Sequence, residues 1–282
     1  MKATRLFWLA GGVLLGTGTA VWRRARERSV QSDREAEIQR RMAQLREEHE
    51  RQDKMRQEFT ANVSHELKTP LTSISGYAEI IREGLVRAED VGPFAGKIYE
   101  EAQRLITLVE DILNLASLDE GAPAQALRET VDLYDLCRET IASLSEAARQ
   151  RNVAFTLSGG HCAVDGVAKI LGEIVYNLCD NAIKYNKEGG SVAVSVAREG
   201  DRVSLAVRDT GIGIPEGETD RVFERFYRVD KSHSKEIGGT GLGLSIVKHA
   251  AAYHDALIRL DSRLGQGTEV KVLFHPAGER TV

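Results

Sequence analysis

The chain has few cysteine, proline and aromatic residues, and each of these low counts argues against a class of protein. Its 282 residues include Cys 3, Pro 5 and 6% aromatic residues. Cys137, Cys162 and Cys179 are far apart in the sequence, so neither a disulfide scaffold nor a structural zinc site is expected, and a reducing compartment fits. So few prolines and aromatic rings also argue against a Pro-rich protein or one that recognises its ligand by stacking.

The charge balance argues against nucleic acid as a partner. Lys and Arg number 38 against 42 Asp and Glu, giving a formal net charge of −4, whereas a nucleic-acid binder usually carries a basic excess. Apolar residues make up 42% and charged residues 28%, which is typical of a globular protein with a real core. A length of 282 residues indicates about two domains with connecting pieces.

An uncharged stretch at residues 6–22 predicts a single transmembrane helix. At about 1.5 Å per residue it would span about 26 Å, slightly short of a hydrocarbon core of roughly 30 Å. More arginines follow the stretch than precede it, which places the rest of the chain in the cytoplasm and the protein in the cell membrane. A cleaved signal peptide is the alternative, and it is excluded if the later domains need ATP. Residues 1–5 leave no room for an external sensing domain, so we expect the signal to come from an accessory membrane protein or from within the membrane.

A charged connector and two amphipathic helices follow the predicted span. Residues 23–54 interleave acidic and basic side chains, which favours a long solvated helix over disorder. Between residues 55 and 120, two apolar seams repeat at intervals of three and four residues, with a break at Gly92 and Pro93. A lone helical hairpin cannot bury two such seams well, whereas two copies can pair as a four-helix bundle, so a homodimer is predicted.

His65 lies on the first of these helices, away from the apolar seam. At about 100° per residue it points roughly 200° from Val63 and from Leu67, so the imidazole is predicted to be exposed. An exposed helical histidine is ordinarily a surface residue. However, Pro70 follows one turn later, where it removes a backbone bond to the Glu66 carbonyl and should kink the helix. A proline is unusual inside a strong apolar repeat, so its presence here favours a functional interpretation of His65.

The second half of the chain alternates between helical and strand patterns after a linker at residues 121–127. Within residues 128–276, helices are expected at about 133–150, 167–185 and 242–253, and strands at about 153–157, 191–197, 203–209, 256–260 and 268–274. A strand hairpin with helices set apart from it favours an α/β sandwich over a Rossmann sheet. Residues 277–282 would form a tail.

One helix of this half carries a polar stripe. Its members, three or four residues apart, are Glu173, Asn177, Asn181 and Lys184. Such a stripe is most often a solvated face, but asparagine is a poor helix former and is unusual on one. Carboxylate and amide oxygens are hard ligands suited to Mg²⁺, which also shares the phosphates of a substrate.

Two glycine-containing segments complete the chemical signals. Asp209 ends a strand just before Gly211 and Gly213, and a carboxylate held there could accept a hydrogen from an amino group such as that of adenine. Residues 238–243, GGTGLG, open a helix, where unpaired backbone N–H groups attract phosphate. The ordinary alternatives are a strand-ending turn and a flexible linker. The glycine spacing does not match a dinucleotide site.

Five segments in a fixed order resemble the boxes of bacterial sensor histidine kinases. They are FTANVSHELKTPLT at 59–72 (H box), NLCDNAIKY at 177–185 (N box), DTGIG at 209–213 (G1 box), FERFYR at 223–228 (F box) and GTGLG at 239–243 (G2 box). The resemblance covers roughly residues 55–275, and the ordered set is far more specific than any single segment. It implies a dimerising phosphotransfer hairpin followed by an ATP-binding α/β sandwich of the Bergerat type.

The resemblance also implies roles for the hairpin and for the metal ligands. His65 would be autophosphorylated, Glu66 would accept a hydrogen bond from its imidazole, and Thr69 would help to orient water when the kinase dephosphorylates its partner. The residues that would hold Mg²⁺ and its waters are Glu173, Asn177 and Asn181.

Further residues would contact ATP. Lys184 would bind phosphate, Tyr185 would pack near the nucleotide, and Asp209 would read the adenine amino group. Residues 216–240 would form a lid over the triphosphate, and the segments around it would contribute Gly211, Gly213, Arg228, Gly239, Thr240, Gly241, Leu242 and Gly243.

The implied activity is ATP-dependent autophosphorylation, followed by phosphotransfer to an aspartate of a response regulator and possible dephosphorylation of that regulator. The gyrase, heat-shock and mismatch-repair ATPases resemble the second half but lack an H box on a dimerising hairpin. A non-enzymatic scaffold has no support, because every box residue is present.

One departure from the family concerns a turn. His254 and Asp255 stand where the family commonly has His-Gly, which puts only the turn conformation in question. The histidines interpreted as structural are His49, His161, His249, His254 and His275, and His233 falls in the predicted lid.

Overall fold

A computed structural model of the chain describes the backbone of residues 3–119, 127–229 and 239–278 and, within these ranges, the side chains from residue 37 onward apart from Gln52. Contacts divide the chain into two units, Met1–Val63 and Ser64–Val282. Residues 121–126 of the predicted linker, residues 230–238 of the predicted lid with His233, and residues 279–282 of the predicted tail lie outside the described residues.

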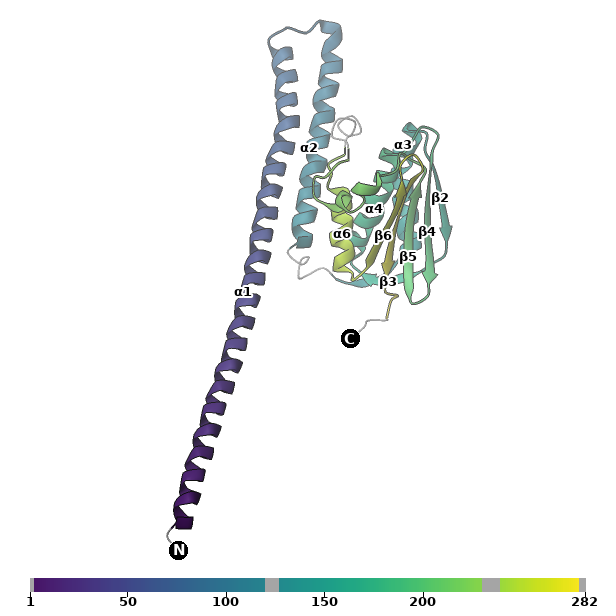
Figure 1. The fold of residues 1–282 in the computed structure, drawn as a ribbon. Helices are drawn as coiled ribbons and strands as arrows, with labels where there is room; N and C mark the ends of the chain where they lie inside the picture. The colour runs from purple at the N-terminus through teal and green to yellow at the C-terminus, as the bar shows by residue number, and fades with distance from the viewer. Residues whose placement is uncertain (1–2, 120–126, 230–238, 279–282) are drawn as a thin grey trace. The chain divides into compact units, whose positions relative to one another are not determined.

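The N-terminal unit is formed by one long helix. Helix α1, Ala3–Arg82, includes the whole charged connector, which the interleaved charges predicted to be helical (Figure 1). Ile38, Met42 and Leu45 are 57–62% exposed on it. No helix within the described ranges is both long and apolar enough to cross a membrane. The side chains of residues 6–22 are not among those described, so the predicted span stays a prediction.

The second unit begins with a helical hairpin, as the two apolar seams predicted. The end of α1 is followed by a short 3₁₀ turn, η1 (Ala88–Asp90), and by α2, Val91–Asp119. The Tyr77 and Phe94 rings pack edge-to-face with centroids 5.6 Å apart, joining the two helices near the turn. Helix α1 continues through Pro70, and the kink predicted there stays a prediction.

The predicted break at Gly92 and Pro93 is wrong by several residues. The turn between the helices lies at residues 83–90, and both of these residues belong to the first turn of α2. The first N–H groups of a helix have no intrahelical partner, so a proline there loses no helical bond and does not end the helix.

An α/β sandwich forms the rest of this unit, as the sequence predicted. Its helices are α3 (Leu133–Gln150), α4 (Ala168–Lys184) and α6 (Gly243–Tyr253), with 3₁₀ turns η2 (Glu216–Glu218) and η3 (Arg221–Phe223). Its main strands are β2 (Ala154–Gly159), β4 (Ser191–Glu199), β5 (Arg202–Asp209), β6 (Leu257–Arg263) and β7 (Gly267–Phe274). They form a mixed sheet in the order β2-β4-β5-β7-β6, in which only β2 and β4 are parallel.

A small second sheet escaped the sequence analysis. Strand β1 (Glu129–Asp132) pairs antiparallel with β3 (Ala163–Gly166). Strands this short offer too few residues for a two-residue alternation to be recognised. They frame the beginning of α3, where Asp132 caps the helix by accepting a hydrogen bond from the Asp135 N–H at 3.0 Å.

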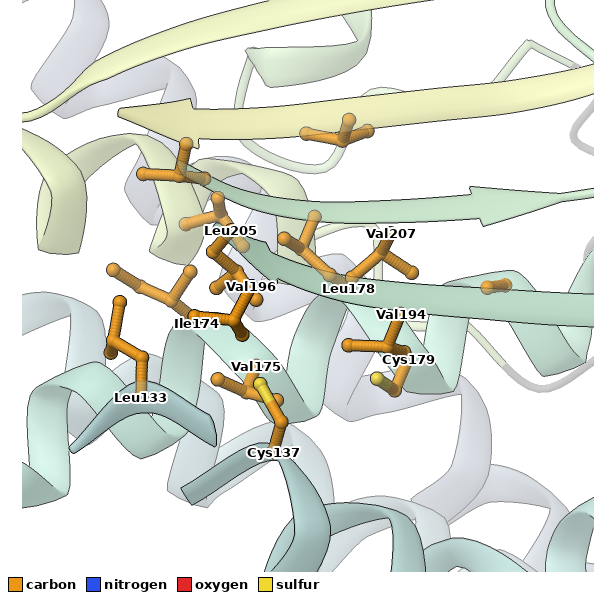
Figure 2. Packing of buried hydrophobic residues seen from close by; sticks show 14 of the residues in the cluster. Leu133, Cys137, Ile174, Val175, Leu178, Cys179, Val194, Val196, Leu205 and Val207 are labelled. Atoms are coloured by element: carbon orange, nitrogen blue, oxygen red, sulfur yellow. The ribbon is translucent and has the colours of Figure 1, made fainter. Parts of the chain in front are cut away.

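The core lies between the helices and one face of the sheet (Figure 2). Every second residue of β4 points into the core. These residues are Val192, Val194 and Val196, and all three are fully buried. Helix α4 presents its apolar residues at intervals of three and four, including Ile174 and Leu178, to the same core.

Two of the cysteines are core residues. Cys137 on α3 and Cys179 on α4 are free and fully buried (Figure 2). Burial raises the pKa of the Cys137 thiol to about 12 and raises the pKa of the Cys179 thiol as well. Both thiols therefore stay protonated and act as small apolar side chains.

His254 ties α6 to the beginning of α4. Its ring is buried, Nδ1 lies 2.8 Å from the Ala250 carbonyl, and Nε2 accepts the Val167 N–H at 3.1 Å. The next residue, Asp255, has φ 54°, in the left-handed region that glycine favours and aspartate tolerates. The departure from the family's His-Gly pair therefore still allows a glycine-type turn.

We expect His254 to make the second unit less stable in mild acid. Burial lowers the pKa of this ring, so the folded protein holds it neutral while the unfolded chain takes up a proton near pH 6.5. The stabilisation is complete above about pH 6.5 and is lost as the pH falls through the lower folded-state pKa. His254→Leu should flatten this pH dependence and lower the free energy of unfolding at pH 7.5 by about 1–3 kcal/mol, because the Val167 N–H loses its acceptor.

Urea denaturation between pH 5 and 8 measures both effects. A His254→Leu protein that loses stability in acid as steeply as the unaltered chain would show that His254 does not cause the pH dependence.

Candidate functional site

A cavity of about 500 Å³ lies among α4, the segment that follows β5 and the beginning of α6. The predicted site residues that line it are Asn177, Asn181, Lys184, Tyr185, Asp209, Gly213, Arg228, Gly239, Thr240, Gly241 and Gly243. Glu173, Gly211 and Leu242 do not line it. The fold thus brings four of the five motifs to one place.

Asp209 is held at the end of β5 with one carboxylate oxygen occupied. Its Oδ1 accepts the Gly211 N–H at 2.7 Å and the Thr268 N–H at 3.3 Å. Burial raises the pKa of this carboxyl, and the two backbone hydrogen bonds lower it. Since both bonds use Oδ1, Oδ2 is available to a ligand in the cavity.

Only glycine fits at position 211, because neighbouring backbone leaves no room for a side chain. A Cβ at this position would lie 2.2 Å from the Tyr185 carbonyl oxygen, a backbone atom that cannot move aside. The same carbonyl accepts the Ile212 N–H at 3.1 Å, which joins the turn after β5 to the end of α4. Gly211 therefore shapes the wall of the cavity without lining it.

The two asparagines of α4 pack against the last glycine of the GTGLG segment. Asn177 is 8% exposed, and its Nδ2 donates to the Glu173 carbonyl at 2.8 Å. A Cβ on Gly243 would lie 2.8 Å from the Asn177 Oδ1 and 3.4 Å from the Asn181 Nδ2. Only glycine lets the beginning of α6 approach these amides so closely.

Lys184 and Glu173, at the two ends of the polar stripe, are engaged by other side chains. The Lys184 Nζ lies 2.6 Å from the Asp180 Oδ2. The Glu173 Oε1 accepts a hydrogen bond of 3.3 Å from the Asn114 Nδ2 on α2. Burial raises the pKa of the Glu173 carboxyl, and the nearby charge of Asp111 raises it further.

The F-box and G2-box segments interlock beside the cavity. The Phe226 N–H donates to the Gly241 carbonyl at 2.9 Å, and the backbone at Phe226 has φ 61°. Gly241 has φ 73°, and a Cβ there would lie 3.0 Å from the Phe226 backbone. An Arg228 Nη2 donates to the Gly239 carbonyl. The glycines therefore allow two segments to meet backbone to backbone.

Helix α6 begins without a conventional side-chain cap. Gly243 is its first residue, and Leu242 before it is fully buried and caps no N–H group with its side chain. The Thr240 Oγ1 accepts the Leu242 N–H at 3.3 Å and donates to the Asp111 Oδ2 on α2 at 2.7 Å. A helix N-terminus of this kind, rich in glycine, suits an anionic ligand.

The three predicted hairpin residues lie on α1 and do not line the cavity. The His65 side chain is 75% exposed, which confirms the exposure predicted from the helical periodicity. Its Nδ1 lies 3.8 Å from the Glu66 Oε1, longer than the predicted hydrogen bond. The Thr69 Oγ1 donates to the His65 carbonyl at 3.2 Å.

Sequence reasoning missed three polar residues of this region. Asp180 lines the cavity and pairs with Lys184, and their spacing of four residues on a helix was the available signal. Asn186 donates to the Ala182 and Ser191 carbonyls at 3.0 and 3.1 Å, fixing the end of α4 to β4. Asp111 lines the cavity from α2, and no local pattern indicated it.

The fold and these sites define a protein with two functional parts. One is a helical hairpin that presents an exposed histidine, and the other is a two-layer domain whose cavity combines asparagine, lysine, aspartate and a glycine-rich helix N-terminus. Such a cavity suits a metal-bound nucleoside phosphate.

Comparison with known proteins assigns both parts. Residues 55–121 match the family described as His Kinase A (phospho-acceptor) domain, and residues 166–278 match the family described as histidine kinase-, DNA gyrase B-, and HSP90-like ATPase. The sensor-like histidine kinase SenX3 of Mycolicibacterium smegmatis is 39% identical over 223 residues, which is 78% of this chain and 58% of SenX3. The sensor histidine kinase WalK of Bacillus subtilis is 37% identical over 228 residues, which is 79% of this chain and 37% of WalK.

Solved structures agree with this assignment. Full-length ShkA in complex with AMPPNP is 30% identical, with a TM-score of 0.56 over 77% of this chain and 46% of that one. The histidine kinase ThkA, solved in complex with the response regulator protein TrrA, shares the fold with a TM-score of 0.63 at 24% identity, over 79% of this chain and 63% of that one. The chain belongs to the sensor histidine kinase family.

Proposed function

We propose that this protein is a membrane-anchored sensor histidine kinase that transfers the terminal phosphoryl group of ATP to His65 and then to an aspartate of a response regulator. The observation that carries the proposal is the convergence of the N, G1, F and G2 segments on one cavity in a chain that also exposes His65. The chain spans 58% of the length of SenX3 and 37% of the length of WalK. The activity of those whole proteins is therefore a proposal for this chain.

The cavity offers a matching group to each part of ATP. The Asp209 Oδ2 accepts a hydrogen from the adenine amino group while its Oδ1 stays bonded to the backbone. Lys184 leaves Asp180 to bind phosphate, and the beginning of α6 directs N–H groups at the same end. Tyr185 lines the cavity and packs beside the nucleotide, and Arg228 lies near Gly239 for a phosphate contact.

The donor set of α4 fits Mg²⁺. The Asn177 Nδ2 is committed to the Glu173 carbonyl, so its Oδ1 is the atom turned toward the cavity side of Gly243. Asn177, Asn181 and Glu173 would supply the oxygen ligands. When bound, the ion would neutralise part of the charge that spreads over the transferring phosphoryl group. Because the hydrogen bond from Asn114 uses only the Glu173 Oε1, Oε2 would be the oxygen that contributes.

His65 supplies the nucleophile from the hairpin. The Glu66 Oε1 lies 3.8 Å from the His65 Nδ1. When this distance shortens to that of a hydrogen bond, the ring proton is held on Nδ1. The Nε2 lone pair then attacks the terminal phosphorus in line as the bond to the ADP oxygen breaks. Thr69 is proposed to orient water for dephosphorylation of the regulator, for which its hydroxyl must leave the His65 carbonyl.

A second copy of the chain would complete the hairpin. Leu71, Ile106 and Leu113 are 58%, 50% and 63% exposed, although apolar residues of a helical pair are ordinarily buried. We therefore propose a homodimer in which residues 55–120 form a four-helix bundle, with residues 128–276 as the nucleotide-binding domain.

Membrane anchoring by residues 6–22 is proposed from the uncharged stretch and its flanking arginines. An alkaline carbonate wash of membranes from cells that make the full chain tests it. The protein should remain in the membrane pellet, and its release into the supernatant would contradict a spanning helix.

Incubation with γ-labelled ATP and magnesium tests the kinase reaction against its rivals. We expect a protein-bound label that is stable in alkali and lost in acid, as a phosphorylated imidazole is. Release of free phosphate without a protein label would instead indicate an ATPase of the gyrase or chaperone kind. A chain that binds no nucleotide would be a scaffold.

A further inference from the structure

Two polar residues stand directly behind the end of the cavity where adenine is proposed to bind. Asn186 follows Tyr185 just beyond the end of α4, and Thr210 follows Asp209, the last residue of β5. Tyr185 and Asp209 line the cavity, whereas Asn186 and Thr210 do not. Any effect of Asn186 or Thr210 on a nucleotide must therefore pass through the residues beside them.

The Asn186 amide uses all of its hydrogen-bonding groups. Its Nδ2 donates to the Ala182 carbonyl at 3.0 Å and to the Ser191 carbonyl at 3.1 Å. Its Oδ1 accepts the Lys187 N–H at 3.1 Å and the Thr210 hydroxyl at 3.2 Å. Since an amide has two N–H hydrogens and two oxygen lone pairs to offer, this side chain is fully satisfied and held in one orientation.

Two glycines make room for Asn186. Gly190 is buried, and a Cβ on it would lie 2.8 Å from the Asn186 Cγ. A Cβ on Gly211 would lie 3.0 Å from the Asn186 Cα. Asn186 therefore fits closely between the turn that precedes β4 and the turn that follows β5.

Thr210 extends the pairing of β4 with β5 by one residue. Its N–H donates to the Ser191 carbonyl at 3.1 Å, and its Oγ1 accepts the Ser191 N–H at 2.9 Å. The hydroxyl has one proton to donate, and the Asn186 Oδ1 at 3.2 Å is a nearer acceptor than the Ser191 carbonyl at 3.5 Å. The Thr210 side chain thus links the strand pair to Asn186.

These bonds fix the turn that holds the Asp209 carboxylate. Gly211 follows Thr210 directly, and its N–H binds the Asp209 Oδ1 at 2.7 Å. The Ile212 N–H then donates to the Tyr185 carbonyl at 3.1 Å. The turn is therefore tied to β4 at Thr210 and to the end of α4 at Ile212. Without the Thr210 hydroxyl the Gly211 N–H would shift, and the carboxylate bonded to it would shift as well.

We propose that Asn186 and Thr210 are positioning residues that set the preference of this site for a nucleotide whose base carries an amino group. They hold the Gly211 N–H in place, so that the Asp209 Oδ1 stays bonded to the backbone and Oδ2 faces the amino group. The inference rests on the proposed function and adds two residues that determine its base specificity. Because the phosphates bind elsewhere in the cavity, the loss of either side chain should weaken recognition of the base alone.

Competitive titrations of the full chain with two nucleotides test the proposal. ATP and purine riboside triphosphate, which lacks only the amino group, each displace a fluorescent ADP analogue in the presence of magnesium. The ratio of their dissociation constants measures the contact with the amino group. Since both nucleotides are titrated into the same sample, this ratio does not depend on the folded fraction, and a purely structural role would leave it unchanged.

Four variants are compared with the unaltered chain. Thr210→Val replaces the hydroxyl with a methyl group of similar size, Thr210→Ser keeps a hydroxyl, and Asn186→Ala removes the amide. Thr156→Val is the matched control, because Thr156 is exposed on β2 of the same sheet.

We expect the unaltered chain to bind ATP about ten- to a hundredfold more tightly than purine riboside triphosphate, the usual range for a hydrogen bond to a charged group. In Thr210→Val and Asn186→Ala the ratio should fall to about threefold or less, because a displaced carboxylate no longer makes that bond. Thr210→Ser and Thr156→Val should keep the ratio of the unaltered chain.

Three results would overturn the inference. Full discrimination in Thr210→Val would show that its hydroxyl does not position Asp209. An equal loss of discrimination in Thr156→Val would assign the effect to the sheet as a whole. An unaltered chain that binds both nucleotides equally well would show that the amino group is not recognised. If that chain bound neither nucleotide, the proposed function would fail instead, so the two failures are distinguishable.

Discussion

A protein carrying His65→Gln is expected to bind ATP with unchanged affinity and to acquire no acid-labile phosphate. Glutamine keeps a polar side chain on the exposed face of α1 but offers no basic nitrogen with which to attack phosphorus. The His65 side chain is 75% exposed and does not line the cavity, so its loss should disturb neither the fold nor nucleotide binding. Labelling with γ-labelled ATP should fall to background.

The matched control is His49→Gln on the same helix. The His49 side chain is 76% exposed, and its ring makes only an ion-pair contact of 3.7 Å with Asp53 among the described residues. This variant should label as fully as the unaltered chain. Persistent label in His65→Gln would show that the phosphoacceptor is another residue, and loss of label in both variants would show that the loss is not specific to His65.

Gly243→Ala is expected to weaken ATP binding by about ten- to a hundredfold. The added methyl would lie 2.8 Å from the Asn177 Oδ1, so either this amide must turn away or the beginning of α6 must shift. Loss of a contact with a charged partner costs about 1.5–3 kcal/mol. The first outcome removes the Asn177 oxygen from the metal, and the second removes a hydrogen bond from the α6 N–H groups to phosphate. Isothermal titration with ATP and magnesium measures the change.

Gly217→Ala separates this effect from a general response to replacing glycine. A Cβ at Gly217 meets nothing within 4 Å, and the backbone there does not adopt a positive φ. Its affinity should equal that of the unaltered protein. An unchanged ATP affinity in Gly243→Ala would mean that Asn177 and the beginning of α6 do not act together in binding.

Local patterns predicted most of the elements because each of them carries its own periodicity. The expected helix at 133–150 coincides with α3, and the valines of β4 alternate as a half-buried strand should. The turn of the hairpin was misplaced because Gly92 and Pro93 look like a break, whereas the first turn of a helix accepts both. Strands β1 and β3 were missed because they are four residues long.

The candidate site was predictable to the extent that it is built from contiguous motifs. Asp209 and Gly243 could be recognised within short segments, and the structure brings both to one cavity. Asp111 could not be recognised, because its importance comes from a contact with Thr240 that joins residues 129 positions apart. The bond between Asn114 and Glu173 escaped prediction for the same reason. Side chains that act between domains leave no local pattern.

Direct mapping of the phosphoryl group tests the central claim most closely. The full chain is incubated with ATP and magnesium, digested at alkaline pH, and sequenced by mass spectrometry with a fragmentation method that preserves phosphohistidine. The account predicts one phosphoryl group on a ring nitrogen of the His65 peptide, removed by brief acid treatment. A stoichiometric phosphoryl group on a serine, threonine or different histidine, with the His65 peptide unmodified, would contradict it.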